Sequence, residues 1–306
     1  MENSISYEEF VDLMFDPDTT ESDIENYIEI DTENSEAYQP RFKFKEGAIR
    51  NPNIESALIL NILNSWYRNK RNNKYKRKIS EGYAGKIIVS EGDSWFQYPM
   101  KLYDIIDNLS DKYAVYSLGA AGDWLKDIIA QNDYLKAIEK EKASVFIVSG
   151  GGNDLVGSER IKNFIKPFEA GLAPEKYIGV QFDAFINQIE NQYRFLFTSI
   201  YEKFPSVKII CHGYDYSIPS SGGKWFGKPM EQIGIKDRTL QQVIAKHISD
   251  RFNILMNSIS QDYPTVTYIN CRNIVGLNRW YDELHPNDDA FKDIAEKFID
   301  IIDQEG

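Results

Sequence analysis

The stretch ASVFIVSGGGND, from Ala143 to Asp154, decides the fold class of this chain of 306 residues. Its first half is an almost continuous apolar run, which is typical of a strand buried on both faces of a sheet. The run then stops abruptly in three glycines, an asparagine and an aspartate. A buried strand that ends in a polar turn indicates a parallel sheet covered by helices on both sides.

Similar apolar runs lie on both sides of this stretch and alternate with helical patterns. The other predicted strands lie at 86–92, 112–119, 207–213 and 265–270, and the predicted helices at 96–109, 123–138, 180–204, 235–260 and 288–302. This alternation favours parallel pairing, because parallel strands are joined by helical crossovers. The sequence therefore predicts an α/β domain over residues 81–306, with three α/β/α layers and a mostly parallel five-stranded sheet.

Composition narrows the class of protein. The hydrophobic fraction of 42% and the aromatic fraction of 13% fit a packed globular core. The chain has no run of about 18 apolar residues, and its start, MENSISYEEF, lacks the basic and apolar regions of a secretory signal. Cys211 and Cys271 each end an apolar run, which is typical of reduced, half-buried thiols. We therefore expect a cytoplasmic protein.

The first 80 residues differ in charge from the rest of the chain. Residues 1–40 contain 13 acidic residues and no lysine or arginine, so most of the net charge of -12 lies there. Capping-box spacings at Ser6/Glu9 and Ser22/Glu25 predict two short helices, and a longer helix is expected over 53–68. Residues 1–80 are therefore predicted to be an acidic helical module that ends in a basic linker. Such a module docks on the rest of the chain or on a partner protein.

The basic linker, RNKRNNKYKRK, runs from Arg68 to Lys78 and contains seven basic residues. Two interpretations remain open. The run is a solvated linker or a strip neutralised by the acidic segment, or it contacts nucleic acid or an anionic membrane surface. A single short basic run favours the first interpretation, so we expect no nucleic-acid partner and treat membrane contact as the lesser alternative.

Polar residues follow every predicted strand of the main sheet. They are Ser94, Gly119, Asn153 and His212 after the first four strands, and Asp282 and His285 after the fifth. Ligands of open parallel sheets bind beyond the carboxyl ends of the strands. We therefore expect these residues to gather at one edge of the sheet.

Three of these residues have the chemistry of a catalytic triad. A serine hydroxyl is a weak nucleophile and needs a histidine base that a carboxylate orients. Of the three histidines, His247 lies within a helical pattern and His212 has no carboxylate close in sequence. His285 lies three residues after Asp282, a spacing that allows a hydrogen bond within a tight turn. The sequence therefore predicts that Asp282 orients His285 and leaves the other imidazole nitrogen for a serine, for which Ser94 is the candidate at the same edge.

Each of these residues also has a purely structural interpretation. Ser94 could cap the following helix, and Asp282 could form a turn before Pro286. The glycines at 150–152 could form a tight turn or a phosphate loop, although no Gly-Lys-Ser/Thr follows them. The coincidence of all the candidates at strand ends favours the catalytic interpretation.

Four segments resemble, in chain order, the conserved blocks of the SGNH (GDSL-type) hydrolases. They are IIVSEGDSW, SLGAAGDWL, VSGGGND and DELHP. The resemblance covers about 86–302 and leaves out the first 80 residues. Trp95 departs from it, since the family usually has leucine after the serine.

This resemblance implies a flavodoxin-like fold and an acyl-transfer reaction in which Ser94 is the nucleophile, His285 the base and Asp282 the orienting acid. We expect no cofactor or metal, since the sequence has no metal-ligand spacing of Cys and His. The oxyanion would be bound by the backbone N–H groups of Ser94 and Gly119 and by the side-chain amide of Asn153. The substrate would be a small-molecule or lipid acyl ester, and the enzyme an esterase, lipase or deacylase. The alternative is a catalytically silent or regulated binding protein on the same scaffold, whose N-terminal module docks a partner.

Two long segments are candidates for the walls of the substrate pocket. Residues 213–230 mix glycines with aromatic side chains, and residues 155–177 form a second insertion. The predicted substrate-binding residues are Trp95, Asp154, His212, Tyr214 and Trp225. The alternative is that the aromatic side chains only pin these loops to the surface.

Overall fold

The main sheet has five parallel strands. The computed structural model describes residues 4–16, 18–35, 39–50 and 56–304. The strands are β3 (Ile87–Gly92), β4 (Ala114–Ser117), β5 (Val145–Ser149), β6 (Lys208–His212) and β7 (Val266–Ile269), in the spatial order β4-β3-β5-β6-β7. This is the strand order of flavodoxin-like doubly wound proteins. The predicted fold class is confirmed.

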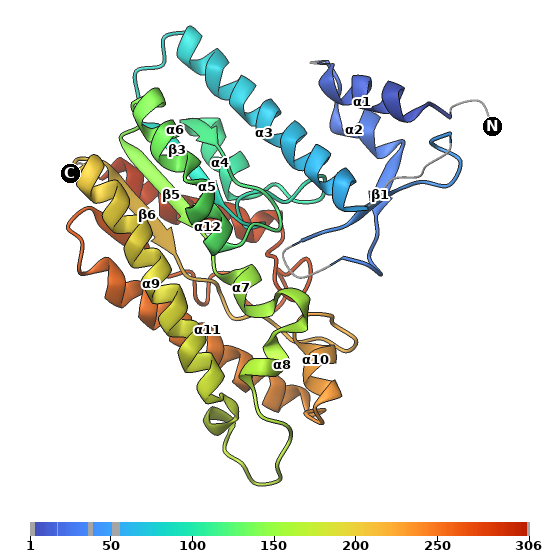
Figure 1. Ribbon diagram of the computed structural model, residues 1–306, viewed down its shortest axis with the longest axis vertical. Helices are drawn as coiled ribbons and strands as arrows, with labels where there is room; N and C mark the ends of the chain where they lie inside the picture. Colours follow the sequence, from blue (N-terminus) through green and yellow to red (C-terminus); the bar gives the residue numbers. More distant parts are fainter. Residues whose placement is uncertain (1–3, 17, 36–38, 51–55, 305–306) are drawn as a thin grey trace.

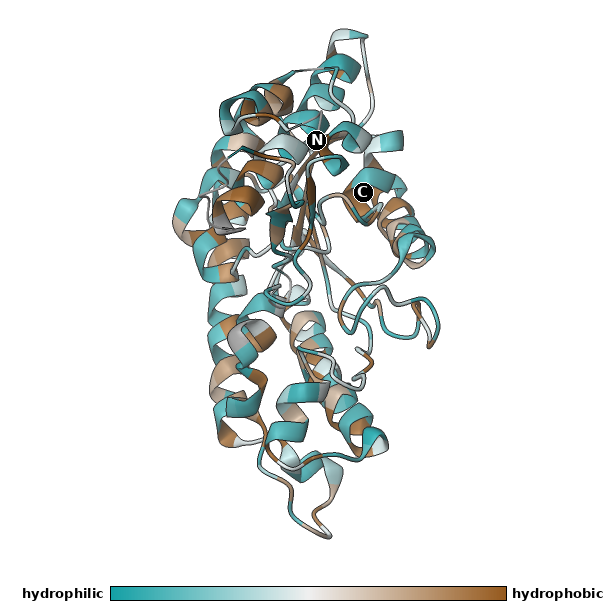
Figure 2. Cartoon of the chain, turned by 90° about the vertical axis from the view of Figure 1, so that its right-hand side faces the viewer, coloured by the Kyte–Doolittle hydropathy of each residue, from teal (hydrophilic) through white to brown (hydrophobic). Residues whose placement is uncertain are grey.

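Helices cover both faces of this sheet (Figures 1 and 2). The main ones are α4 (Ile105–Lys112), α5 (Leu125–Gln131), α6 (Asp133–Glu141), α9 (Val180–Lys203), α11 (Arg238–Ser260) and α12 (Asp288–Asp303). Helices α4 and α12 pack together on one face, and α5, α9 and α11 pack together on the other. Figure 2 shows the hydrophobic strands between these layers, as expected for strands buried on both faces.

The two predicted wall segments contain short helices beyond the carboxyl edge of the sheet. These segments and the residues next to them form α7 (Gly152–Val156), η1 (Gly157–Glu159), α8 (Ile161–Phe164), η2 (Pro174–Tyr177) and α10 (Gly227–Gln232). The segments contact each other, since α8 packs on α10 and the Phe168 N–H donates to the Ile233 carbonyl at 2.9 Å. The two insertions therefore support one another rather than standing apart (Figure 1).

Two helices differ from the prediction. The expected helix over 123–138 is two helices, because Asn132 takes the left-handed conformation at φ 58° and breaks the hydrogen-bond ladder. Asparagine tolerates this conformation better than most residues. The expected helix over 96–109 starts only at Ile105, where the Asp104 carboxylate accepts the N–H groups of the first turn.

The N-terminal residues form a small unit with its own core. Helix α1 (Tyr7–Phe15) begins at the predicted Ser6/Glu9 capping box. Helix α2 (Glu21–Glu25) is capped by Thr20 and Asp23, so the predicted pair Ser22/Glu25 is wrong. An antiparallel pair, β1 (Ile28–Ile30) and β2 (Phe42–Phe44), was not predicted, since each strand has only three residues. The core contains Phe10, Ile24, Phe42, Leu63 and Trp66, among others.

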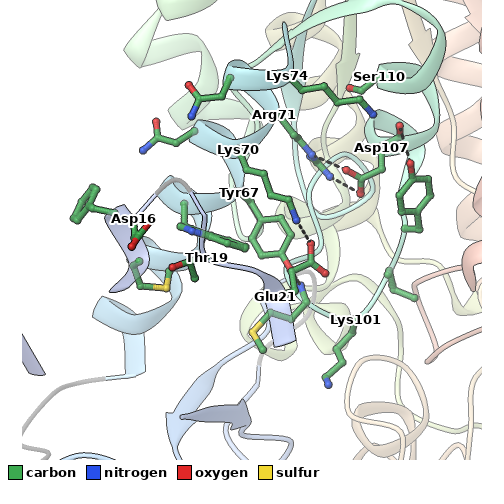
Figure 3. Close-up of a pocket in the computed structure, with 18 of the residues that line it drawn as sticks. Asp16, Thr19, Glu21, Tyr67, Lys70, Arg71, Lys74, Lys101, Asp107 and Ser110 are labelled. Atoms are coloured by element: carbon green, nitrogen blue, oxygen red, sulfur yellow. Dashed lines mark hydrogen bonds and ion pairs between the residues drawn. The ribbon is translucent and has the colours of Figure 1, made fainter. Parts of the chain in front are cut away.

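Helix α3 (Ser56–Ser80) joins this N-terminal unit to the main sheet. The prediction of a basic linker after residue 68 is wrong, because the helix continues through the whole basic run; the predicted start at Asn53 lies outside the described residues. Lysine and arginine are good helix formers, and neighbouring acids pair with them. Lys70 binds Glu21 and Arg71 binds Asp107 (Figure 3). Asn72 pairs with the backbone of Ser117 and so covers the edge strand β4.

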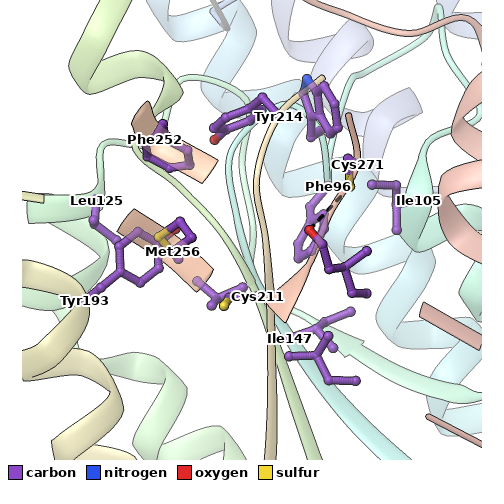
Figure 4. Close-up of a cluster of buried hydrophobic side chains, with 14 of the residues drawn as sticks. Phe96, Ile105, Leu125, Ile147, Tyr193, Cys211, Tyr214, Phe252, Met256 and Cys271 are labelled. Atoms are coloured by element: carbon purple, nitrogen blue, oxygen red, sulfur yellow. Dashed lines mark hydrogen bonds between the residues drawn. The ribbon is translucent and has the colours of Figure 1, made fainter. Parts of the chain in front are cut away.

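Both cysteines lie inside the hydrophobic core (Figure 4). Cys211 and Cys271 are free thiols with no exposed surface, so the prediction of half-buried thiols is wrong. Burial raises the pKa of each thiol. They therefore act as small apolar side chains in the packing. In the described part of the chain, no helix has the length and apolarity to cross a membrane.

Candidate active site

A buried carboxylate shapes the turn that carries Ser94. Asp93 directly follows β3 and has no exposed surface. Its carboxylate accepts the Trp95 N–H at 3.1 Å, the Ser149 hydroxyl at 2.8 Å and the Tyr214 hydroxyl. Because Ser149 ends β5 and Tyr214 follows β6, Asp93 ties the turn after β3 to the two next strands of the sheet.

A continuous hydrogen-bonded chain joins three of the predicted residues. The Ser94 Oγ lies 2.8 Å from His285 Nε2. His285 Nδ1 lies 2.8 and 2.9 Å from the two carboxylate oxygens of Asp282. A proton on Nδ1 that is donated to Asp282 leaves Nε2 as the acceptor for the serine hydroxyl. The structure therefore brings Ser94, His285 and Asp282 together.

The turn from Asp282 to His285 holds this geometry locally. One Asp282 oxygen also accepts the backbone N–H groups of Leu284 and His285, each at 2.8 Å. Burial raises the pKa of Asp282, but the charge of His285 and these hydrogen bonds outweigh burial, so the pKa lies below its ordinary value. Asp282 is therefore ionised at neutral pH. The Tyr98 ring packs edge-on against the imidazole, with ring centroids 4.6 Å apart.

The predicted oxyanion donors lie on loops that converge on Ser94. Gly119 packs so closely on the backbone at Gly92 that a Cβ atom there would lie 2.8 Å from the Gly92 carbonyl oxygen. A glycine is required for this approach. Within the described residues, the backbone N–H groups of Ser94 and Gly119 make no hydrogen bond. Unpaired N–H groups in a buried site are rare and are available to an oxyanion.

Asn153 lies in the first turn of α7, beyond the end of β5. Its side-chain amide donates to the Asp123 carbonyl at 2.8 Å, and a carboxamide has a second N–H to offer. The preceding Gly152 N–H donates to the Tyr214 hydroxyl at 3.2 Å, and that hydroxyl in turn donates to Asp93. This chain of bonds couples the position of Asn153 to the turn that carries Ser94.

The predicted substrate-binding residues fall into two groups. Trp95 and His212 lie in the core: their rings stack with centroids 5.4 Å apart, and the Trp95 indole N–H donates to the Leu284 carbonyl at 3.0 Å. Burial lowers the pKa of His212, so its imidazole is neutral. Both rings are buried among protein side chains, although His212 Nε2 has no hydrogen-bond partner within the described residues. Contact of either ring with a substrate stays a prediction.

The other three predicted substrate-binding residues lie around the catalytic turns. Tyr214 binds Asp93, and Trp225 is half-buried on the segment after β6. One Asp154 oxygen accepts the Leu125 N–H at 3.0 Å, while the other has no partner in the described part of the chain. Burial raises the pKa of Asp154 to about 6.

Two residues at this edge were missed by the sequence analysis. Glu283 lies between Asp282 and His285 and binds the segment after β6. Tyr98 contacts the imidazole of His285. Nothing in the sequence singles out either residue, because their partners lie far away along the chain.

The site is enclosed in this structure. Ser94, Asn153 and His285 are only 0–2% exposed. The cavity of about 810 Å³ in Figure 3 lies elsewhere, between α1, α3 and the segment before α4. No group of three or more His, Cys, Asp or Glu side chains within the described ranges is placed to hold a metal ion.

The fold and the site together define a doubly wound α/β protein with a Ser–His–Asp arrangement at the carboxyl edge of its sheet. No family model matches the sequence, and no curated protein matches it.

Solved structures that the fold resembles include lipases and esterases. One is an extracellular lipase from Streptomyces rimosus, at 13% identity and a TM-score of 0.49, with 71% of this chain and 99% of that chain covered. Another is phospholipase A1 from Streptomyces albidoflavus, at 15% identity and a TM-score of 0.48, with 71% of this chain and 99% of that chain covered. A third is a family 3 carbohydrate esterase from Clostridium thermocellum, at 14% identity and a TM-score of 0.43, with 71% of this chain and 97% of that chain covered. Because the sequence identities and TM-scores are this low, the activities that these names state are those of the other proteins and are not assigned to this chain.

Proposed function

We propose that the chain is a serine hydrolase that cleaves a carboxylic ester, as an esterase, lipase or deacylase. The observation that carries this proposal is the hydrogen-bonded chain from the Ser94 hydroxyl through His285 to Asp282. Structural interpretations explain each residue singly: Ser94 as a cap, and Asp282 as a turn former. They give no reason for a serine 191 positions away in the chain to lie 2.8 Å from the Nε2 nitrogen of a histidine that Asp282 orients.

In the proposed mechanism, Ser94 Oγ attacks the ester carbonyl carbon while His285 Nε2 accepts the hydroxyl proton. The resulting tetrahedral intermediate collapses to an acyl-serine when His285 returns the proton to the leaving alcohol. Water then repeats both steps and releases the acid. Asp282 holds the tautomer of His285 and stabilises the imidazolium that forms in each step.

The negative oxygen of each intermediate needs donors that are already in place. The backbone N–H groups of Ser94 and Gly119 are unpaired within the described residues, and the Asn153 amide has one N–H to offer. Donors of this kind typically contribute about 3–4 kcal/mol each to the stabilisation of the transition state.

A substrate reaches Ser94 only after some neighbouring chain moves, because the serine has no exposed surface. The N-terminal unit and α3 contact loops on both sides of the site. Lys224, after β6, donates to the carbonyl oxygens of Thr32 and Glu33. Asn64 of α3 exchanges two hydrogen bonds with the backbone of Ala121, after β4.

The same burial favours a second candidate function. A scaffold whose nucleophile is permanently enclosed would be a catalytically silent binding protein, with the N-terminal unit as its docking surface. Turnover of a soluble ester separates the two functions.

The test is hydrolysis of p-nitrophenyl acetate and butyrate by the full chain. Ser94→Ala and Asp282→Asn should each lower kcat/KM by about 10⁴-fold, because the first removes the nucleophile and the second the correct histidine tautomer. Ser206→Ala, at an exposed serine in the turn before β6, is the matched control and should retain activity. Turnover that survives Ser94→Ala would remove the proposed nucleophile, and a wild-type chain without turnover would favour the binding protein.

A further inference from the structure

The carboxylate of Glu283 organises the segment that follows β6. The residue lies between Asp282 and His285 and is 5% exposed. Its two oxygens accept four backbone N–H groups, those of Ser220 at 2.8 Å, Trp225 at 2.8 Å, Phe226 at 3.2 Å and Gly227 at 2.9 Å. An ionised carboxylate is suited to this task, because it only accepts hydrogen bonds and has about four lone-pair sites.

Gly223 is a second and independent sign that the segment is built around this carboxylate. A Cβ atom at Gly223 would lie 2.1 Å from both Cδ and Oε1 of Glu283. The φ angle of Gly223 is not in the left-handed region, so backbone conformation does not require a glycine there. The missing side chain therefore serves the close approach of the carboxylate.

The position of Glu283 connects this segment to the proposed catalytic residues. The turn that carries Glu283 also supplies Asp282 and His285, and hydrogen bonds within the turn fix its backbone. Residues 220–227 are thus held by a side chain of the same short turn that places the imidazole. The segment carries Trp225, a half-buried aromatic side chain, and Lys224, which contacts the N-terminal unit.

We propose that Glu283 is a positioning residue that fixes residues 220–227 beside the triad, where they form the wall that selects substrates by size. This proposal rests on the proposed ester hydrolysis. It assigns to Glu283 no contact with the reacting atoms. Loss of the carboxylate would loosen the wall and change the binding of bulky esters, whereas attack by Ser94 on a small ester would continue.

The kinetic test compares a small and a large ester, p-nitrophenyl acetate and octanoate, in Glu283→Gln and Glu283→Ala. We expect the ratio of the two kcat/KM values to change by about 10-fold or more through KM, with kcat on acetate within about threefold of wild type. Ser206→Ala, at an exposed serine in the turn before β6, should leave the ratio unchanged. An unchanged ratio in the Glu283 variants, or an equal fall of kcat on both esters, would overturn the proposal.

Limited trypsin digestion tests the anchoring without any enzymatic activity. Lys224 is the one trypsin site between residues 213 and 235, because Pro229 follows Lys228 and blocks cleavage there. Cleavage after Lys224, mapped by mass spectrometry, should be at least about fivefold faster in Glu283→Ala and in Gly223→Ala than in wild type. Ser206→Ala should match the wild-type rate.

The two readouts separate the possible failures. If the wild-type chain hydrolyses no ester, the proposed function fails, and unchanged cleavage rates then overturn the anchoring as well. If hydrolysis is present but cleavage after Lys224 stays slow in both variants, the segment is held by other contacts and Glu283 is not its anchor. If Glu283→Ala does not fold, the rate of cleavage after Lys224 in Gly223→Ala still tests the anchoring.

Discussion

Glu91 is the residue with the clearest consequence for stability. It lies in β3, is 6% exposed, and one of its carboxylate oxygens accepts the Gly92 N–H at 3.0 Å. Burial, with the nearby charge of Asp123, raises its pKa from 4.5 to about 8. Between these two pH values the folded chain keeps a proton that the unfolded chain has lost. The free energy of unfolding therefore falls as pH rises through this window.

Glu91→Gln should remove this pH dependence, because the amide keeps the acceptor oxygen but cannot ionise. We expect the variant to gain about 3 kcal/mol over wild type at pH 8 and to gain little at pH 5. Urea unfolding at both pH values measures the difference. Glu81→Gln, at an exposed glutamate, should show no pH-dependent gain, and an equal gain at both pH values would contradict the assignment.

Single residues differ in how far the sequence predicts their surroundings. The contact of Asp282 with His285 follows from a spacing of three residues, which a local turn satisfies. Two of the partners of Asp93, Ser149 and Tyr214, lie 56 and 121 positions away in the chain. The partners of Glu283 lie 56 to 63 positions away. A sequence pattern carries no signal for contacts of that range.

Helix α3 shows what a basic run does when acidic elements surround it. Arg71, at its centre, is 5% exposed. Its guanidinium donates to Asp104, to Asp107 and to the Phe96 carbonyl. These bonds join α3 to the N-terminus of α4 and to the turn after Ser94. The basic run therefore acts in packing at this position.

Arg71→Ala should destabilise the protein by about 3 kcal/mol, because it leaves the buried Asp104 carboxylate without its cation. The pKa of Asp104 is already raised to about 7 by burial, even with Arg71 present to lower it. Arg77→Ala is the matched control, since the Arg77 side chain has no ion pair among the described residues. Thermal unfolding of both variants measures the difference in stability, and Arg71→Ala should melt at the lower temperature. Equal melting temperatures would contradict the role given to Arg71.

The elements of the main sheet could be predicted because their apolar runs are long and their strands are buried on both faces. The end of α3 could not, because its last ten residues are polar except for Tyr75 and Ile79, and the acids that pair with Arg71 and Lys74 lie on α4 or at its N-terminus. The break between α5 and α6 at Asn132 was not predicted either. An asparagine within a helical pattern does not by itself indicate a residue in the left-handed conformation.

At the level of the whole molecule, the strand order places the candidate site. Chain direction across the sheet reverses between β4 on one side of β3 and β5 on the other, and ligands of doubly wound sheets bind at this switch point. Ser94 follows β3, Gly119 follows β4 and Asn153 follows β5. The expectation that polar residues at strand ends gather at one edge follows from parallel pairing alone, and the structure brings the loops after these strands together.

The N-terminal unit was the part least accessible to prediction. Its acidity indicated a separate module but not where the module lies. In the structure its hairpin region contacts Lys224, while its core includes Ala121 of the loop after β4. These contacts come from tertiary packing and join the unit to the loops after β4 and β6.

The most direct test of the central claim is labelling of the full chain with a fluorophosphonate, followed by mass-spectrometric mapping of the modified residue. A serine that His285 activates should react, because the phosphonate mimics the tetrahedral intermediate of acyl transfer. The account predicts one adduct, on Ser94, with labelling lost in His285→Ala. An adduct on another serine while Ser94 stays unmodified and ester turnover proceeds would contradict it.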